Sequence, residues 1–443
     1  MQSTRTGDSG GDVAETDGSG ARGGSRGREL LLGLIVAGIA SVAMLYVAEL
    51  ALRALRSDPG LDAIDEASRR GEPWDLRSRL EVVADLRERG VDAVSRTIPA
   101  ALAEPDEQGV YRARLRADGR EILPLGGISR KTVVLCNELG QYAIYQSDEH
   151  GFRNPPGLWD RAPVDVVLVG DSFAIGECVP SEQALGARIR EHFPTTVNLG
   201  MGGHTPLHEL AVLSEYGPTL RPRRVVWFYF ENDLWWFDLG ISKRTPLLMR
   251  YLEPGFRQSL VDRQPAIDRL LLELFASGAG DPERNVVDRL EEQRGTPLER
   301  IGRILALRKL RTTVSALLRP PASPQAREAP DFALFERILR LARERVGAWG
   351  GDLYFVYMPA VWTFDEGFGW APRDDRVRVR VLEIAEELGL PVIDVQPIFA
   401  SHDDPLSLYS VPGTSVLGPP HMNGDGYRIV ADAVVARLSG GRN

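Results

Sequence analysis

Lysine is nearly absent from this 443-residue chain, so arginine supplies almost all of the 53 basic side chains. Acidic residues outnumber basic ones by 62 to 53, and the formal net charge is −9. The chain therefore lacks the basic surplus that binding to nucleic-acid phosphates requires, and we expect no nucleic-acid partner. Cysteine is also scarce, with only Cys136 and Cys178. The residues leave open whether these two form a disulfide or remain buried free thiols.

One long apolar run lies near the N-terminus. Leu30 to Ala48 contains no charged residue, and its length matches a helix that crosses a bilayer core. A cleaved signal peptide has a shorter apolar region followed by a small-residue cleavage site, and no such pattern follows this run. The sequence therefore favours an uncleaved transmembrane anchor over residues 29–52. Residues 1–28 are rich in Gly, Ser, Asp and Thr, and we expect them to form a disordered tail.

The charges around the apolar run predict its orientation. Arg22, Arg26 and Arg28 precede the run, and positive charges beside a span favour the cytoplasmic side. Although Arg53 and Arg56 follow it, we expect a single-pass protein with a cytoplasmic N-terminus. Everything after the anchor would then lie in the periplasm or at the cell surface, where a disulfide can persist.

Beyond residue 150, apolar strands alternate with helix-like segments. This alternation is typical of an α/β domain whose mainly parallel, five-stranded sheet is covered by helices on both faces. The expected strands are 164–169, 196–199, 224–230, 353–358 and 391–395, and the clearest helices are 182–192, 206–215, 335–349 and 424–439. Gly440 is the expected stop of the last helix.

Two segments stand outside this alternation. Residues 53–149 form an N-terminal extension with charged helices and turns, in which residues 131–146 suggest one or two strands. About residues 240–330 form a helical insertion that ends in a Pro- and Ala-rich linker. The insertion is either a lid over a site or a helical layer against the body of the domain or the membrane.

Polar clusters stand where the expected strands end, which is where α/β proteins bind ligands. Gly170-Asp171-Ser172 follows the first strand, and its serine is either a helix N-cap or a nucleophile. "NLGMGGHT", residues 198–205, follows the second strand, and Asn232 follows the third. His421 comes after a Pro-Pro turn near the C-terminus. Their order and placement indicate an active site.

These blocks resemble those of the SGNH hydrolases, also called GDSL-type esterases and lipases, over about residues 150–440. "GDSFAIGE" matches the nucleophile block at Ser172, and "NLGMGGHT" matches the glycine block at Gly203. "END" matches a block usually written Gly-x-Asn-Asp at Asn232, and "HMNGDGYRIVA" matches the histidine block at His421. "HGFRNPPG", just upstream, is similar to members with an N-terminal membrane anchor. The resemblance agrees with a flavodoxin-like three-layer α/β/α sandwich.

The resemblance also implies the roles of these residues. Ser172 would attack an ester carbonyl, and His421 would take the serine proton and deliver it to the leaving alcohol. The backbone N–H groups of Ser172 and Gly203, with the side-chain amide of Asn232, would form the oxyanion hole. We expect no cofactor and no metal.

The sequence departs from the family pattern at two positions. Glu231 stands where a glycine is common, and Gly418 stands where the family usually has an aspartate, three residues before the histidine. Either the site works as a Ser–His dyad, or a backbone carbonyl or another carboxylate holds the imidazole. Asp403 and Asp404 are near in sequence. Asp171 is expected to pack and to hydrogen-bond in the turn beneath the serine.

Two further groups of residues require an interpretation. His204 and His208 have the four-residue spacing of a helical metal site, but no third ligand accompanies them, so we expect a surface or helix-start role. Several tryptophans follow the third and fourth strands, where they either contact substrate or line the helical insertion. They are Trp235, Trp236, Trp362 and Trp370.

The leading functional hypothesis is a membrane-anchored, extracytoplasmic serine esterase that removes acyl groups, acetyl above all, from a surface glycan. The reasons for choosing a glycan as the substrate are the family's frequent association with carbohydrate esters and the tryptophans named above, whose flat rings can contact sugars. One alternative is an O-acyltransferase, in which the same serine passes the acyl group to a polysaccharide hydroxyl. The other is a non-catalytic glycan-binding protein with a degenerate triad, which only the missing aspartate supports.

Overall fold

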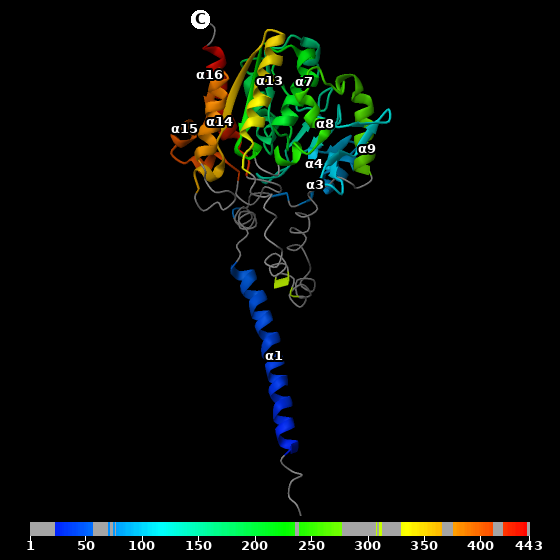
Figure 1. The fold of residues 1–443 in the computed structure, drawn as a ribbon, viewed down its shortest axis with the longest axis vertical. Helices are drawn as coiled ribbons and strands as arrows, with labels where there is room; N and C mark the ends of the chain where they lie inside the picture. Colours follow the sequence, from blue (N-terminus) through cyan, green and yellow to red (C-terminus); the bar gives the residue numbers. More distant parts are fainter. Residues whose placement is uncertain are drawn as a thin grey trace, which may run out of the picture. The chain divides into compact units, whose positions relative to one another are not determined.

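The computed structural model describes residues 23–55, 70, 74–75, 77–234, 239–276, 307, 310–311, 329–365, 375–410 and 420–440. These residues belong to two units (Figure 1). The first unit comes from residues 1–56 and 295–320, and the second from residues 57–294 and 321–443. Most of the predicted tail and most of the second half of the predicted insertion lie outside the described residues.

Helix α1 (Gly23–Leu55) is the long helix of the first unit, and it begins inside the predicted tail. Its stretch Arg28–Ala51 is long and apolar enough to cross a membrane. Large apolar side chains along this stretch, such as Leu30 and Leu34, are exposed. A signal sequence near an N-terminus has the same properties, so the helix fits either an anchor or a signal sequence.

The second unit is built on a five-stranded sheet in the order β12–β11–β10–β8–β9, and every neighbouring pair is parallel. This is the flavodoxin-like order, and its topological switch point lies between the first and third of these strands along the chain. Each strand lies within two residues of its predicted bounds. The strands are β8 (Val166–Val169), β9 (Val197–Asn198), β10 (Arg224–Phe230), β11 (Asp352–Met358) and β12 (Val392–Asp394).

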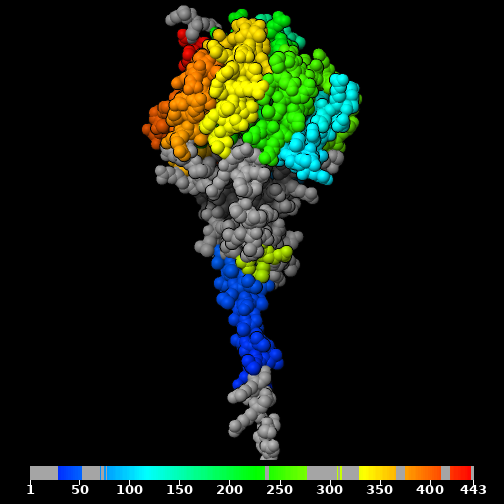
Figure 2. Space-filling view, in the orientation of Figure 1, coloured from blue at the N-terminus to red at the C-terminus, as the bar shows by residue number. Residues whose placement is uncertain are grey.

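Helices cover both faces of this sheet, which confirms the three-layer sandwich. Side chains of β8 alternate between two cores: Val167 and Val169 face one, and Val166 and Leu168 face the other. The first core includes α7 (Pro206–Leu220), α13 (Phe332–Ala348) and α14 (Asp375–Glu387), and the second includes α5 (Ser172–Ile175), α6 (Leu185–Arg190) and α16 (Gly424–Ser439). Figures 1 and 2 show α14, α13 and α7 side by side on one face.

One predicted helix is interrupted, and another is confirmed together with its cap. The helix expected over 182–192 is split, because Ala184 has an extended backbone between the short 3-10 turn η2 (Ser181–Gln183) and α6. The last helix, α16, ends at Ser439, and Gly440 is its C-cap, as predicted.

The N-terminal extension contains more strands than its sequence suggested. β1 (Ala93–Ser95), β6 (Thr132–Val134) and β7 (Ile144–Gln146) form a three-stranded sheet, and the last two confirm the strands expected within 131–146. The remaining elements are α3 (Arg79–Glu88), α4 (Pro99–Leu102) and two antiparallel pairs, β2 (Ala103–Pro105) with β3 (Tyr111–Ala113) and β4 (Leu115–Ala117) with β5 (Arg120–Ile122). Strands of three residues are too short to show an alternating pattern.

The described part of the insertion is helical, as predicted, and it packs against the extension. Asp268 accepts hydrogen bonds from the backbone and hydroxyl of Ser129 at 2.9 and 2.6 Å, and Gln258 bonds both backbone groups of Leu123. This part therefore forms a layer against the body of the domain rather than a lid. Its elements are α8 (Pro246–Met249), η5 (Arg250–Leu252), η6 (Val261–Arg263) and α9 (Gln264–Ala276).

The segment "HGFRNPPG" fastens the extension to the loops at the switch point. Arg153 is buried and donates to the carbonyl oxygens of Gly176 and Val179, at 2.6 and 2.8 Å. Asn154 exchanges two hydrogen bonds with the backbone of Asn198, at 2.8 and 2.9 Å. The turns after β8 and β9 are thus held by side chains of the preceding segment.

Replacing Arg153 should destabilise this unit. In Arg153→Met two buried carbonyls lose a charged donor, so we expect the free energy of unfolding to fall by about 2–4 kcal/mol. Urea denaturation followed by tryptophan fluorescence measures the change. The control is Arg161→Met, since Arg161 is exposed. Equal stabilities of the two variants would show that Arg153 does not fasten the loops.

Candidate active site

The turn after β8 presents Ser172 at the start of α5. Asp171, not Ser172, is the N-cap of this helix, because its carboxylate accepts the backbone N–H of Phe173 at 2.9 Å. The turn role predicted for Asp171 is therefore confirmed. Gly170 is required, since a Cβ there would lie 2.6 Å from the Cβ of Ala174. As the first residue of the helix, Ser172 has a backbone N–H without a partner inside the helix.

The glycine block packs directly on this helix. A Cβ on Gly200 would lie 2.8 Å from the Cβ of Ala174. Gly203 has a φ of +79°, as its turn role predicts, and a Cβ there would lie 3.3 Å from Cδ of Pro99. Within the described residues, the backbone N–H of Gly203 donates no hydrogen bond. The extension therefore covers the outer side of the block and leaves this N–H unpaired.

Asn232 follows β10 at the same edge of the sheet. It lies in the 3-10 turn η3 (Glu231–Leu234), and β10 pairs with β8 so that Trp227 is opposite Val169. The ring of Phe230 stacks on that of Phe173, with centroids 3.8 Å apart. The Oδ1 atom of Asn232 is buried and has no hydrogen-bond partner in the described part of the chain.

Glu231, which replaces the family's common glycine, fastens the end of β11. Its carboxylate accepts from the hydroxyl of Tyr357 at 2.8 Å and from Nε1 of Trp362 at 2.5 Å. Trp362 is buried and belongs to the same core as α5, α6 and α16. The other three tryptophans named above lie outside the described residues.

His421 is held just before α16, beside the nucleophile helix. Asn423 caps α16 through two backbone N–H groups, and the carbonyl of His421 accepts the N–H of Ser410 at 2.7 Å. The imidazole lies 5.0 Å from the ring of Phe173, centroid to centroid. Phe173 directly follows Ser172, so the imidazole lies against the nucleophile helix, next to the residue predicted as the nucleophile.

A carboxylate from the extension holds this imidazole. Oε1 of Glu138 lies 2.7 Å from Nδ1 of His421, and Oε2 accepts the backbone N–H of His421 at 2.9 Å and the hydroxyl of Ser410 at 2.6 Å. Asp403 and Asp404, the neighbours considered from the sequence, are exposed, so that suggestion is wrong. Gly418 lies outside the described residues.

The surroundings of Glu138 keep it ionised. Burial would raise the pKa of this carboxyl, but the charge of His421 and the donated hydrogen bonds lower it below its ordinary value. The interaction therefore stabilises the fold at neutral pH and is lost as the pH falls through that lowered value. A carboxylate only accepts hydrogen bonds, so we assign the proton of the neutral imidazole to Nδ1, which leaves Nε2 as an acceptor.

A second carboxylate lies on the other side of the ring. Oε2 of Glu177 is 3.9 Å from Nε2 of His421, and Glu177 is buried. Arg96 of the extension forms an ion pair with Glu177, which offsets its charge. A Cβ on Gly202 would lie 2.7 Å from this carboxylate, so the pair also abuts the glycine block.

Cys136 and Cys178 form a disulfide, which decides the alternative that the sequence left open. Cys136 is two residues before Glu138, and Cys178 is six residues after Ser172. The sulfur of Cys178 lies 3.9 Å from Nδ1 of His421. The bond therefore joins the segment that carries the acid to the loop that follows the nucleophile helix.

His204 and His208 are both buried, so the predicted surface role is wrong, while His208 does lie in the first turn of α7. Burial lowers the pKa of both imidazoles. Among the described residues, the one group with metal-ligand spacing is Glu138, Cys178 and His421, and the sulfur of Cys178 is already in the disulfide.

Sequence reasoning missed Glu138 because it is 283 residues from His421 and lies outside the family's motifs. Only one feature of the sequence pointed to Glu138, and it did so indirectly. A disulfide between the two cysteines would place any acid near Cys136 beside the nucleophile loop.

Comparisons with known proteins identify the family of this chain. The model of the GDSL-like lipase/acylhydrolase family matches residues 168–429. This chain belongs to that family, and it is an ester-bond hydrolase. No curated protein matches the sequence.

Solved structures of similar proteins include a lipase/acylhydrolase from Enterococcus faecalis, with 14% identity, a TM-score of 0.34, and coverage of 62% of this chain and 96% of that one. A GDSL-like lipase from Bacteroides thetaiotaomicron has 12% identity and a TM-score of 0.31, over 63% and 90% of the two chains. A psychrotrophic esterase from a Pseudoalteromonas species has 9% identity and a TM-score of 0.29, over 62% and 97%.

The contact between Glu138 and His421 predicts a large catalytic effect. In Glu138→Gln the neutral amide cannot stabilise the imidazolium, so kcat on p-nitrophenyl acetate should fall by about 10²–10⁴ with KM little changed. Asp404→Asn, at an exposed acid near His421 in sequence, should retain full activity. Equal activity of the two variants would exclude Glu138 from the catalytic site.

Proposed function

We propose that this protein is a membrane-anchored, extracytoplasmic serine esterase with the triad Ser172, His421 and Glu138. The observation that carries the proposal is the imidazole of His421, held by a buried carboxylate and lying against the residue that follows Ser172. The alternative of a non-catalytic glycan-binding protein rested on the absence of an aspartate that would orient His421. The carboxylate of Glu138 lies at the imidazole of His421, which removes that argument.

The chemistry uses these three side chains in two steps. Oγ of Ser172 attacks the ester carbonyl carbon while Nε2 of His421 takes the hydroxyl proton. Glu138 orients the ring and stabilises its positive charge, and His421 then delivers the proton to the departing alcohol. Water, with His421 again as the base, attacks the acyl-serine and releases the acid.

The tetrahedral intermediate carries a negative oxygen that needs fixed donors. The backbone N–H groups of Ser172 and Gly203 and the amide of Asn232 supply them, from the ends of three adjacent strands. The support is that both backbone groups lack other partners among the described residues. One such donor contributes about 3–4 kcal/mol to lowering the barrier.

The surroundings of the two glycines favour a short acyl group. Pro99 approaches Gly203, and the buried Glu177 approaches Gly202, so little space remains beside the oxyanion hole. We therefore retain acetyl as the acyl group. The apolar α1 and the formed disulfide support an extracytoplasmic location, since disulfides persist there, and a surface glycan is the ester-bearing substrate we assign.

Labelling with a fluorophosphonate probe tests the nucleophile. The full-length chain in detergent should form a covalent adduct at Ser172, because His421 activates its hydroxyl, and Ser172→Ala should remove the label. Ser181→Ala, at an exposed serine of η2, is the matched control and should label like the wild type. Labelling that survives Ser172→Ala would overturn the assignment.

Product analysis separates hydrolysis from acyl transfer. With p-nitrophenyl acetate and an oligosaccharide acceptor at millimolar concentration, we expect acetate as the main product, since nothing in the proposed mechanism excludes water from the acyl-serine. Mass spectrometry of the sugar measures the competing product. Acetylated sugar as the dominant product would replace the esterase proposal with the O-acyltransferase.

A further inference from the structure

Glu138 lies in the tip of the hairpin between β6 and β7. The hairpin extends beyond its strands through two backbone bonds, from Leu135 to Ala143 and from Ala143 to Cys136, each 2.9 Å long. Residues 137–142 then form the tip, which we call the acid tip. The position of the carboxylate therefore depends on how this loop is attached to its surroundings.

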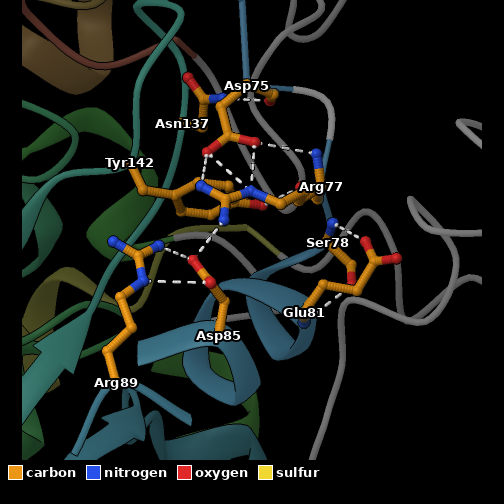
Figure 3. A network of polar contacts seen from close by, with 8 residues as sticks. All are labelled: Asp75, Arg77, Ser78, Glu81, Asp85, Arg89, Asn137 and Tyr142. Atoms are coloured by element: carbon orange, nitrogen blue, oxygen red, sulfur yellow. Dashed lines mark hydrogen bonds and ion pairs between the residues drawn. The ribbon is translucent and has the colours of Figure 1, made fainter. Parts of the chain in front are cut away.

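One side of the acid tip is tied to the start of the extension (Figure 3). Nδ2 of Asn137 donates to the carbonyl of Asp75 at 2.7 Å, and the N–H of Asp75 donates to the carbonyl of Gly140 at 2.7 Å. The hydroxyl of Tyr142 donates to the carbonyl of Arg77 at 2.8 Å. These bonds stay within the extension, so they do not set the distance from the tip to Ser172 or His421.

The other side is tied covalently to the catalytic domain by the disulfide. Cys136 stands at the base of the acid tip, and Cys178 stands in the loop after α5, with their Cα atoms 5.1 Å apart. The bond thus links the segment of the acid to the segment of the nucleophile, across 42 residues of sequence. It is placed where it can fix the 2.7 Å contact between Glu138 and His421.

Such a contact tolerates little movement. Glu138 is a buried charge, and burial favours its neutral form unless its hydrogen-bond donors stay in place. A displacement of the tip by about 1 Å would lengthen the hydrogen bond to Nδ1 beyond its effective range and misalign the imidazole.

We propose that the Cys136–Cys178 disulfide is a positioning element of the active site, and that its reduction lowers hydrolysis by releasing Glu138 from His421. This inference rests on the proposed function. A dithiol such as dithiothreitol supplies two electrons and two protons, so the S–S bond breaks, two thiols form, and the dithiol becomes a cyclic disulfide. Reoxidation restores the contact and the activity.

The experiment compares the oxidised and reduced full-length protein in detergent. After reduction and removal of the dithiol, a thiol-counting reagent should detect both cysteines, and kcat on p-nitrophenyl acetate should fall about 10- to 100-fold. KM should change little, and oxidised glutathione should restore the rate.

Two sets of variants provide matched controls. The double variant Cys136→Ser/Cys178→Ser should have the kcat of the reduced enzyme. Its kcat should not change on addition of the dithiol, since the chain has no other cysteine. In the Glu138→Gln background, the same double substitution should change kcat less than twofold, because the group it positions is already lost.

Three results would overturn the inference. They are full activity with two free thiols, an equal loss in the wild-type and Glu138→Gln backgrounds, and a loss that follows unfolding in far-ultraviolet circular dichroism. Failure of the proposed function is distinguished beforehand, since it would appear in the oxidised enzyme as activity that survives Ser172→Ala.

Discussion

The hydrogen-bonded contact between Glu138 and His421 is the interaction on which the arrangement of this site depends. A buried carboxylate is stable only while its charge is compensated, and here the imidazole, a backbone N–H and the hydroxyl of Ser410 all converge on it. The same contact fixes the ring's tautomer and leaves Nε2 as an acceptor. In the proposed mechanism, the stability of the fold and the state of the catalytic imidazole therefore depend on the same side chain.

The extension packs directly on the proposed active site. Its Pro99 and Arg96 cover the glycine block, and Arg153 and Asn154, which follow the extension in the chain, hold the turns after β8 and β9. The proposed catalytic residues Ser172, Gly203 and Asn232 follow strands at the switch point of the sheet, and the extension packs around them. Residues that are far apart in the sequence are therefore expected to meet at one site.

The sequence predicted the sheet because its strands are buried runs that stop at polar residues, and Arg224–Phe230 matches its strand without error. It also predicted the turns at Ser172 and Gly203, because short glycine-containing motifs constrain the backbone locally. It could not predict Glu138, since no local pattern marks a residue whose role comes from tertiary contact alone. The buried position of His204 was missed for the same reason, because burial depends on which other parts of the chain pack against a residue.

The origin of the acid in a separate hairpin has a consequence for domain boundaries. The stretch that matches the family, residues 168–429, contains the serine, the glycine, the asparagine and the histidine, but not their carboxylate. With the proposed triad, the smallest active enzyme is therefore larger than the stretch that matches the family. A match to the family's motifs alone does not include every catalytic residue proposed for this chain.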